Sequence, residues 1–372
     1  MSILKINKFL ILENIIYNTK KFNIIIGKQA SGKSLIVKLD YFFQTIFNEI
    51  FYKTINLTKK EFEVEIKNIF NNYFPKYSWE KDEINIEYYF NNFQVLLYKT
   101  KTQKIIKLLF NKEFLKFRND KKNELKKTTK NGIFENIEFY ENKKSNIFIP
   151  AVRSLFSNIE KNIFLFNSEK INLDPFLLNL GKYYEIVKEN SFINEKMKIQ
   201  TFSILNGEFV YKNKESWINQ NNKLIKLINS SSGQQETLPL LLILNYFSEM
   251  GSNHFFVEEP EAYIFPESQK TIIEILSISY NMSNNISITT HSPYILSSIN
   301  NLIILNEVIK RGYKNNLEYK AIDINNVTAY MLENNNLTNI IEDNLIQASK
   351  IDNISNEINE EFDEYMSLIY KV

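Results

Sequence analysis

The chain has 372 residues, of which 44% are hydrophobic and 24% charged, and a formal net charge of +2. This balance is typical of folded globular proteins and excludes a disordered or fibrous chain, while the length allows one main domain with insertions. The lack of cysteine excludes disulfides and thiolate metal sites, and the two histidines are too few for an ordinary structural zinc site.

Composition also bears on partners and location. Because the net charge is small, binding to nucleic acid would depend on a local basic patch. No apolar run approaches the roughly 20 residues that cross a bilayer, and the N-terminus lacks the basic stretch and apolar core of a signal peptide. We therefore expect a cytoplasmic protein without a membrane partner.

The N-terminal third predicts strands, a helix and then a change of pattern. Residues 2–26 are rich in β-formers and predict strands that end at Gly27, and apolar residues recur at helical spacing from Lys33. Residues 51–145 mix helices with short strands and contain a lysine-rich stretch at 118–130. We interpret 51–145 as an inserted region of mixed α/β structure.

The following segments predict one buried strand, helices and a hairpin. Ile147–Ile149 form an apolar run stopped by Pro150, and residues 151–195 are mainly helical in pattern. A hairpin is predicted at Phe202–Tyr211, turned at Asn206-Gly207, and a strand at Lys223–Ile228.

The C-terminal third alternates helices and strands from 229 to 310, which is the pattern of α/β folds. An acidic amphipathic helix is predicted from about residue 340. The fold class expected from the whole chain is therefore α/β.

One glycine-rich segment follows the apolar strand and opens the helix, in the pattern G-x-x-x-x-G-K-[ST] of a P-loop. In such a loop backbone N–H groups face phosphates at a helix N-terminus, the lysine binds the β and γ oxygens, and the Ser hydroxyl ligates Mg²⁺. The nucleotide-binding residues predicted here are Gly27, Lys28, Ala30, Ser31, Gly32, Lys33 and Ser34.

Two adjacent carboxylates follow the apolar strand at 254–257, at the end of a strand where α/β sheets bind ligands. We assign Glu258 to Mg²⁺, through water, and Glu259 to the attacking water as the catalytic base. Glu261 is interpreted as favouring the N-terminus of the next helix. His254 begins the strand and is interpreted as structural.

Two further segments carry weaker signals. His291 follows the strand Ile286–Thr290, so its imidazole could contact the γ-phosphate or the water, or it could simply be packed or cap a helix. The segment Ser230–Glu236 precedes an apolar helix, and its hydroxyls and Gly233 suit either an anion site or an N-cap without a ligand.

Together these segments resemble ABC-type ATPases, and specifically the bacterial AAA-type group related to SMC and OLD-family heads. The order is that of the family: IIIGKQASGKS, SSSGQQETLPLLLIL, FFVEEPEAYIFPESQ and ITTHSPYILSSINNL, with IPAVRS at 149–154. The similarity covers about half of the chain.

The resemblance implies an ABC-type P-loop head with a mixed β-sheet flanked by helices and α-rich insertions. The head comprises 1–50 and 146–330, with a helical insertion at about 155–200, the inserted region 51–145 and a helical tail at 331–372. ATP is the substrate and Mg²⁺ the cofactor, and Glu258, Glu259 and His291 become the metal-binding acid, the base and the switch residue. The residues expected to contact the ATP of a second copy are Ser231, Ser232, Gly233 and Gln234.

Three departures from the family accompany this similarity. Glu258 stands where many relatives have Asp, Ser232 stands where transporters have Gly, and no glutamine is assigned to the Q-loop. Arg153 in IPAVRS is expected either near the nucleotide or in a structural ion pair.

Partners remain open between two hypotheses. The resemblance to stand-alone ATPases of anti-phage systems of the AriA and PtuA types implies a homodimer or higher oligomer that controls a separate effector, such as a nuclease. The alternative is a DNA-binding repair or recombination ATPase, whose phosphate contacts would come from a lysine group that otherwise forms a solvated face. Those residues are Lys121, Lys122, Lys126, Lys127 and Lys130.

Overall fold

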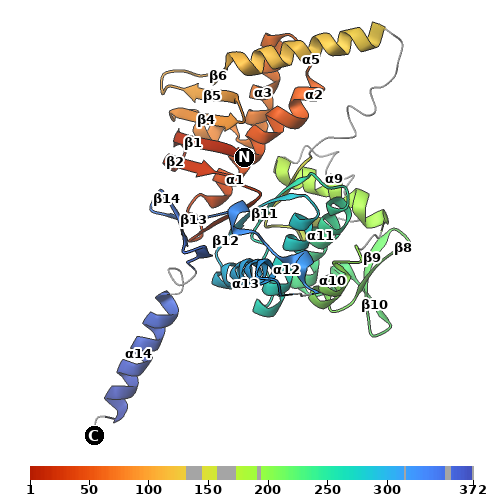
Figure 1. Ribbon diagram of the computed structural model, residues 1–372, viewed down its shortest axis with the longest axis vertical. Coiled ribbons are helices and arrows are strands. Elements are labelled where there is room, and N and C mark those ends of the chain that lie inside the picture. The colour runs from red at the N-terminus through yellow and green to blue at the C-terminus, as the bar shows by residue number, and fades with distance from the viewer. Residues whose placement is uncertain (131–144, 157–172, 191–193, 314–315, 348–352, 371–372) are drawn as a thin grey trace.

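The computed structural model shows two β-sheets stacked about one helix, with further helices on the outer face (Figure 1). The residues it describes are 1–130, 145–156, 173–190, 194–313, 316–347 and 353–370. The parts of the predicted insertions at 131–144 and 157–172 lie outside this set. No helix of the described residues is long and apolar enough to span a membrane.

The central sheet is mixed and has the strand order β14-β13-β3-β12-β11-β7. All neighbouring pairs are parallel except β13 with β14. Its strands are β3 (Phe22–Gly27), β7 (Asn146–Ile149), β11 (His254–Glu258), β12 (Asn285–Thr290), β13 (Val327–Glu333) and β14 (Asn336–Asn339). The predicted α/β class, a mixed sheet flanked by helices, is confirmed.

The second sheet is antiparallel, in the order β2-β1-β4-β5-β6. Its strands are β1 (Ser2–Phe9), β2 (Leu12–Asn18), β4 (Ile84–Phe90), β5 (Phe93–Lys99) and β6 (Lys107–Phe110). Strands β4, β5 and β6 belong to the region 51–145 that we interpret as an insertion, and β4 pairs directly with β1. Cross-strand pairing depends on contacts distant in sequence, which a local pattern does not contain.

Helix α1 (Lys33–Thr45) lies between the two sheets. On β3, Ile25 packs with α1 and the antiparallel sheet, whereas Ile24 and Ile26 pack in the other core, with the outer helices. Both faces of β3 are thus buried, which explains its continuous apolar run. The helices contributing to the second core are α9 (Pro175–Asn190), α10 (Lys198–Leu205), α11 (Ser232–Ser248), α12 (Pro266–Asn281) and α13 (Pro293–Lys310).

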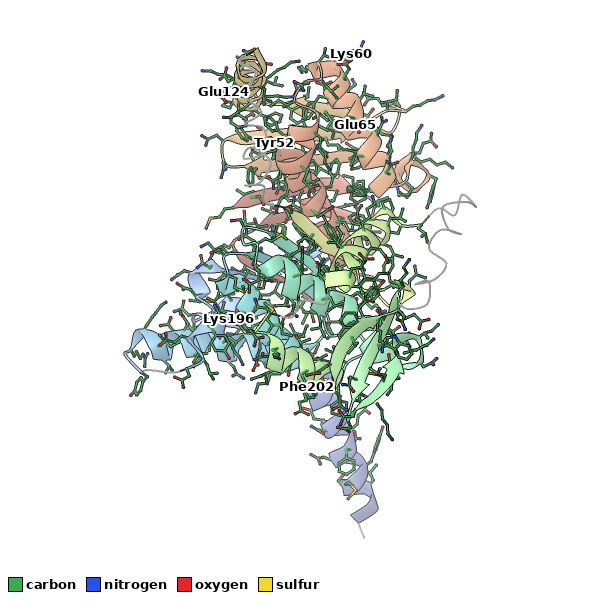
Figure 2. The ribbon with its side chains drawn as sticks, turned by 90° about the vertical axis from the view of Figure 1, so that its right-hand side faces the viewer. Tyr52, Lys60, Glu65, Glu124, Lys196 and Phe202 are labelled. Atoms are coloured by element: carbon green, nitrogen blue, oxygen red, sulfur yellow. The ribbon has the colours of Figure 1, made fainter. Side chains whose placement is uncertain are left out.

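Helices also cover the antiparallel sheet, and a small hairpin sheet lies beside α10, away from the antiparallel sheet (Figure 1). Figure 2 shows Glu124 on α5 and Lys60 on α3 at one end and Phe202 on α10 towards the other. The remaining helices here are η1 (Ile46–Ile50), α2 (Phe51–Lys53), α3 (Lys59–Tyr73), α4 (Lys76–Trp79) and α5 (Lys112–Lys130). The hairpin sheet contains β8 (Glu208–Lys212), β9 (Glu215–Gln220) and β10 (Lys223–Lys226).

The hairpin predicted at Phe202–Tyr211 is wrong in position. Asn206 ends α10 in the left-handed conformation, with φ 48°, and its N–H donates to the carbonyl of Phe202. The chain turns instead between β8 and β9 at Asn213 and Lys214, both with positive φ. Asn tolerates positive φ in a helix cap as well as in a turn, so Asn206-Gly207 did not distinguish the two.

The C-terminal tail begins as sheet. β13 and β14 extend the central sheet beyond residue 330, and β15 (Ile341–Glu342) and β16 (Leu345–Ile346) form a small pair. The predicted tail helix starts later than residue 340, as α14 (Asn353–Tyr370).

A buried polar group joins α1 to both sheets. The carboxylate of Asp40 accepts hydrogen bonds from Gln44 (3.1 Å), Tyr88 (2.9 Å) and Ser2 (3.4 Å). Burial raises the pKa of Asp40 to about 6, although these hydrogen bonds oppose the shift. Gln44 also hydrogen bonds the ring of His254, at 2.9 Å, as expected for a structural histidine.

Candidate functional site

The predicted P-loop connects β3 to α1, and its lysine, Lys33, is the first residue of α1. Gly32 has φ 104° and is the N-cap of α1, and Ala30 also has positive φ, at 61°. A side chain at Gly27 would collide with the carbonyl oxygen of Leu332 on neighbouring β13. Packing against β13 therefore requires glycine at position 27, whether or not a ligand is bound.

Lys33 is folded back over this loop. Its ammonium donates to the carbonyls of Gly27 (2.6 Å) and Lys28 (2.7 Å), and its side chain is buried. Burial lowers the pKa of Lys33, and the carboxylates of Glu259 and Glu261 oppose that shift. A positive charge is thus held at the N-terminus of α1, where backbone N–H groups also favour an anion.

Glu258 ends β11 and is buried beside α1. Burial raises the pKa of Glu258, and the nearby Lys38 ammonium and Ser34 hydroxyl oppose that shift. Its Oε1 atom has no hydrogen-bond partner among the described residues. A carboxylate and a hydroxyl that lie near each other, with an unsatisfied carboxylate oxygen, suit a hard cation such as Mg²⁺.

Ser31 adds a second unsatisfied group at this place. Its hydroxyl oxygen is buried within the loop and, in the part of the chain that the structure describes, lacks a hydrogen-bond partner. Buried polar atoms are rarely left unpaired in folded proteins, so such an atom in a phosphate-type loop fits a ligand oxygen. Among the same described residues, no three His, Asp or Glu side chains cluster as a self-sufficient metal site.

Glu259 and His291 follow neighbouring strands and face each other. The Nδ1 atom of His291 lies 3.9 Å from Oε1 of Glu259, and the two side chains are 49% and 25% exposed. Glu259 has φ 42°, and its backbone N–H donates to the carbonyl of Thr289 on β12 at 2.9 Å. A carboxylate and an imidazole that are close and open to solvent can orient a water molecule and accept its proton.

Glu261 does not serve the next helix, contrary to the prediction. Its Oε1 atom accepts hydrogen bonds from the Thr290 hydroxyl (2.6 Å) and the His291 backbone N–H (2.9 Å), and it lies 3.4 Å from Nδ1 of His291. Helix α12 begins only at Pro266, one full turn later. Glu261 therefore holds the loop that carries His291, a role that the sequence analysis missed.

Arg153 forms an ion pair, as one of the two predicted alternatives expected. Its side chain is 0% exposed and its Nε lies 3.9 Å from the carboxylate of Glu236 on α11. It also donates to the backbone carbonyls of Glu258 (3.1 Å) and Glu259 (3.2 Å). The signal available in the sequence was Glu236 itself, an acidic residue at the start of an otherwise apolar helix, where burial requires a partner.

The segment predicted to act across a dimer begins α11. Ser231 is the N-cap and forms a reciprocal capping box with Gln234, with N–H to side-chain distances of 3.3 and 3.1 Å. Ser231 and Ser232 are exposed, and a Cβ at Gly233 would lie 2.8 Å from the carbonyl oxygen of Tyr263. The cap is satisfied within the chain, yet the exposed N-terminus of a long helix still favours an anion.

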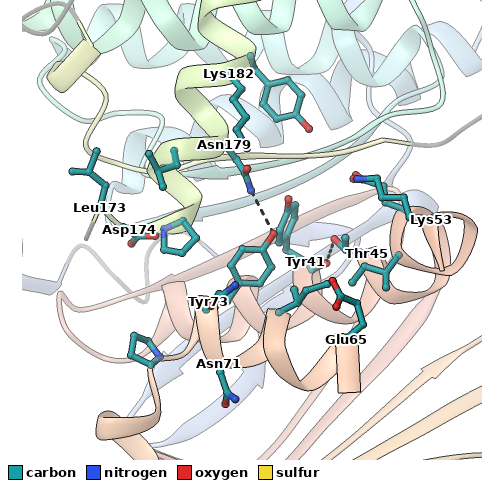
Figure 3. Close-up of a pocket in the computed structure, with 18 of the residues that line it drawn as sticks. Tyr41, Thr45, Lys53, Glu65, Asn71, Tyr73, Leu173, Asp174, Asn179 and Lys182 are labelled. Atoms are coloured by element: carbon teal, nitrogen blue, oxygen red, sulfur yellow. Dashed lines mark hydrogen bonds and ion pairs between the residues drawn. The ribbon is translucent and has the colours of Figure 1, made fainter. Parts of the chain in front are cut away.

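Two hollows lie near these elements. A hollow of about 440 Å³ opens beside the carboxylates and is lined by Glu259, Glu261, Tyr263, His291 and Tyr294, among others. A larger one, about 1130 Å³, lies between α3 and α9 and contains Tyr73, whose hydroxyl accepts a 3.4 Å hydrogen bond from Asn179 (Figure 3). The larger hollow includes none of the predicted site residues.

The lysine-rich helix α5 is partly engaged within the chain. Lys121 pairs with Glu124 at 2.7 Å, and Lys122 donates to the carbonyls of Asn56 and Leu57 at 2.9 and 3.0 Å. The side chains of Lys126, Lys127 and Lys130 lie outside those described. Two of the five lysines considered for DNA phosphates thus have protein partners.

No protein-family model matches this chain. Among curated proteins, the chain is similar to Protein Ycf2 of Physcomitrium patens, with 31% identity over 239 residues, which is 60% of this chain and 9% of that protein. The chain therefore spans less than a tenth of the length of that relative.

Among solved structures, the chain is similar to the SMC head domain from Thermotoga maritima, with 13% identity, a TM-score of 0.43 and coverage of 91% of this chain and 98% of that chain. It is also similar to the Smc head domain with an extended coiled coil from Pyrococcus furiosus, bound to the C-terminal domain of ScpA. There the identity is 12%, the TM-score 0.42 and the coverage 96% of this chain and 100% of that chain. The description of the fold rests on the strand order and loop geometry given above.

Proposed function

We propose that the chain is an ATP-hydrolysing P-loop protein. The observation that carries this proposal is the position of the Ser34 hydroxyl near the Glu258 carboxylate, which places the end of the phosphate-type loop at the end of β11. Lys33 supplies the positive charge next to these two groups, and Glu259 with His291 stands at the same edge of the sheet. The phosphate-binding, metal-binding and water-orienting groups that we propose for one chain therefore lie near one helix N-terminus.

Each residue has a distinct role in this proposal. Lys33 and the loop N–H groups bind and orient the β and γ phosphates, and Glu259 accepts the proton of the attacking water while His291 fixes its position. Mg²⁺, held by Ser34 and, through water, by Glu258, would neutralise charge on the phosphates. The unsatisfied oxygens of Ser31 and Glu258 support this fit.

We further propose that two copies close around ATP and that the closed state controls a separate effector, such as a nuclease in anti-phage defence. The exposed start of α11, with Ser231 and Ser232, supports closure, because it presents the positive end of a long helix to an anion of a second molecule. Closure of this kind would complete each site, so turnover is slow without it. We propose that the chain binds ATP and Mg²⁺ in the cytoplasm and that the bound nucleotide joins it to a second copy.

Glu259→Gln in the full chain tests the hydrolytic proposal. The substitution keeps the shape of the side chain and removes the base, so turnover should fall by at least about 100-fold while ATP binding persists. Phosphate release and equilibrium binding of ATP are the two measurements, and Glu267→Gln, at an exposed position on α12, is the matched control. Undiminished phosphate release would refute Glu259 as the base.

Light scattering of Glu259→Gln with ATP and Mg²⁺, against the same protein with ADP, tests closure. An ATP-dependent doubling of mass is expected, and a mass independent of nucleotide contradicts it. Purification of tagged Glu259→Gln from its native cells then separates the two biological roles. A stoichiometric effector supports the defence role, whereas bound DNA without such a protein supports the alternative repair ATPase.

A further inference from the structure

The buried guanidinium of Arg153 connects two elements of the proposed site that lie apart in the sequence. On one side the backbone N–H of Arg153 donates to Oε2 of Glu236 at 2.7 Å, and the side-chain Nε of Arg153 donates to the backbone carbonyl of Glu236 at 3.0 Å. On the other side Nη1 and Nη2 reach the carbonyls of Glu258 and Glu259. One side chain thus joins the first turns of α11 to the turn that follows β11.

The carboxylate of Glu236 is held on both oxygens. Its Oε1 atom accepts a hydrogen bond from the Ser154 hydroxyl at 2.5 Å, while Oε2 accepts from the backbone of Arg153. Glu236 and Arg153 are both buried. A buried ion pair with its hydrogen bonds satisfied has a fixed geometry, since any displacement exposes an unpaired charge to the protein interior.

A second contact couples the same two elements independently of Arg153. Gly233, in the first turn of α11, lies so close to the carbonyl of Tyr263 that a Cβ there would approach the oxygen to 2.8 Å. Tyr263 belongs to the turn between β11 and α12 that begins with Glu259. The N-terminus of α11 therefore cannot shift towards this turn without displacing the backbone of the turn at Tyr263.

The residue at the centre of these contacts is conformationally strained. Glu259 has φ 42°, which costs a non-glycine residue on the order of 1–3 kcal/mol and persists only where surrounding contacts enforce it. Here its N–H donates to the Thr289 carbonyl and its carbonyl accepts from Arg153. The orientation of the Glu259 carboxylate therefore depends on both of these backbone hydrogen bonds.

We propose that Arg153 and Glu236 are a positioning pair that sets the Glu259 carboxylate according to the position of α11. This inference rests on the proposed function and specifies its regulation within one protomer. When the exposed end of α11 meets an anion of a second copy, any movement of the helix passes through Arg153 to the backbone of Glu258 and Glu259. Neither Arg153 nor Glu236 contacts substrate, because both side chains are buried behind the carboxylate turn.

The test uses Arg153→Lys and Glu236→Gln in the full chain, with Glu267→Gln as control. Lysine cannot donate to the Glu236 and Glu259 carbonyls in the same fork, and glutamine removes the charge while keeping the shape. We expect kcat to fall on the order of 100-fold in each variant, since small misplacements of a catalytic group have effects of this size. KM should change by less than about twofold, because substrate binding is left in place.

Further readouts separate positioning from a purely structural role. In the Glu259→Gln background, both substitutions should leave ATP-dependent dimerisation within about twofold. With Glu259 intact, the Arg153→Lys and Glu236→Gln double variant should lose no more kcat than the more impaired of the two single variants. Unchanged kcat in folded variants overturns the inference, as do losses of kcat that only match a loss of folded protein. Should Arg153→Lys fail to fold, Glu236→Gln decides alone.

The proposed function is measured first and separately. Turnover by the unmodified chain and ATP-dependent dimerisation of Glu259→Gln are its two requirements. If either is missing, the proposed function fails and this inference fails with it. If both hold and the two positioning variants keep the kcat of the Glu267→Gln control, only the positioning pair is disproved.

Discussion

The carboxylate of Glu261 accepts a 2.9 Å hydrogen bond from the backbone N–H of His291, and so ties together the loops that follow two adjacent strands. Glu261→Ala removes this acceptor and the one for the Thr290 hydroxyl. We expect kcat to fall on the order of 10-fold to 100-fold, with ATP binding little changed, because His291 loses its support. Steady-state phosphate release measures this.

Glu261→Gln is the matched control for that prediction, since the amide oxygen can still accept both hydrogen bonds. It should retain most of the activity that Glu261→Ala loses. Equal losses in the two variants would mean that the negative charge of Glu261, and not its position as an acceptor, supports the site.

Lys33→Ala should weaken nucleotide binding itself. The ammonium is the positive charge held over the loop by the carbonyls of Gly27 and Lys28, and removal of such a charge costs phosphate affinity. We expect the Kd for a fluorescent ATP analogue to rise on the order of 10-fold or more, equivalent to about 1.4 kcal/mol per decade. The exposed Lys270→Ala is the control, and a Kd shared by both variants contradicts the assignment.

Asp40 predicts a pH dependence of stability. Its pKa of about 6 in the folded chain is above the value of 3.8 that is ordinary for an aspartate side chain, so the folded state holds this proton more tightly than the unfolded state does. The resulting stabilisation is present below about pH 4 and is lost as the pH rises through 6. The loss amounts to roughly 3 kcal/mol at most.

Asp40→Asn should remove this dependence while keeping an acceptor for Gln44 and Tyr88. Thermal unfolding at several pH values between 4 and 8 is the measurement. The melting temperature of the variant, relative to the unmodified chain, should increase with pH across that range. A difference that stays constant would show that Asp40 remains ionised in the folded chain at all of these values.

Arg118 fixes α5 to the segment that follows α2. Its guanidinium donates to the carbonyls of Thr54 (2.8 Å) and Leu57 (2.9 Å) and lies 4.5 Å from the ring centre of Phe62. Arg118→Ala leaves these carbonyls without their donor and should destabilise the chain by about 2–4 kcal/mol in urea unfolding.

Lys121→Ala provides the comparison on the same helix. Its ion pair with Glu124 is largely solvent-exposed, so this variant should lie within about 0.5 kcal/mol of the unmodified chain. Equal destabilisation by the two substitutions would show that Arg118 acts only as one more charge on α5.

The local part of the site could be predicted from sequence because each motif directly follows a strand of the same parallel sheet. Parallel strands present their C-terminal ends at one edge, so Gly27, Glu258 and His291 must approach one another once β3, β11 and β12 are neighbours. The position of Ser34 near Glu258 is the outcome of that register.

Other features depend on partners that no local pattern specifies. The pairing of β1 with β4 joins segments about 80 residues apart, and the contact of Arg153 with Glu236 spans 83 positions. The turn at Asn213 was missed for a different reason: Asn206-Gly207 carries the same residue preference but ends a helix. Long-range contacts and shared turn chemistry thus mark the limit of the sequence analysis.

The closeness of Gly27 to the Leu332 carbonyl has a consequence for the history of this chain. A glycine that begins a nucleotide motif is ordinarily explained by the ligand, yet here the adjacent strand forbids any larger residue. A descendant that abandoned nucleotides would still be held to glycine at this position by selection for folding. In such a descendant, substitutions would appear first at Lys33 and Glu259. A glycine retained at position 27 would therefore not indicate that nucleotide hydrolysis is retained.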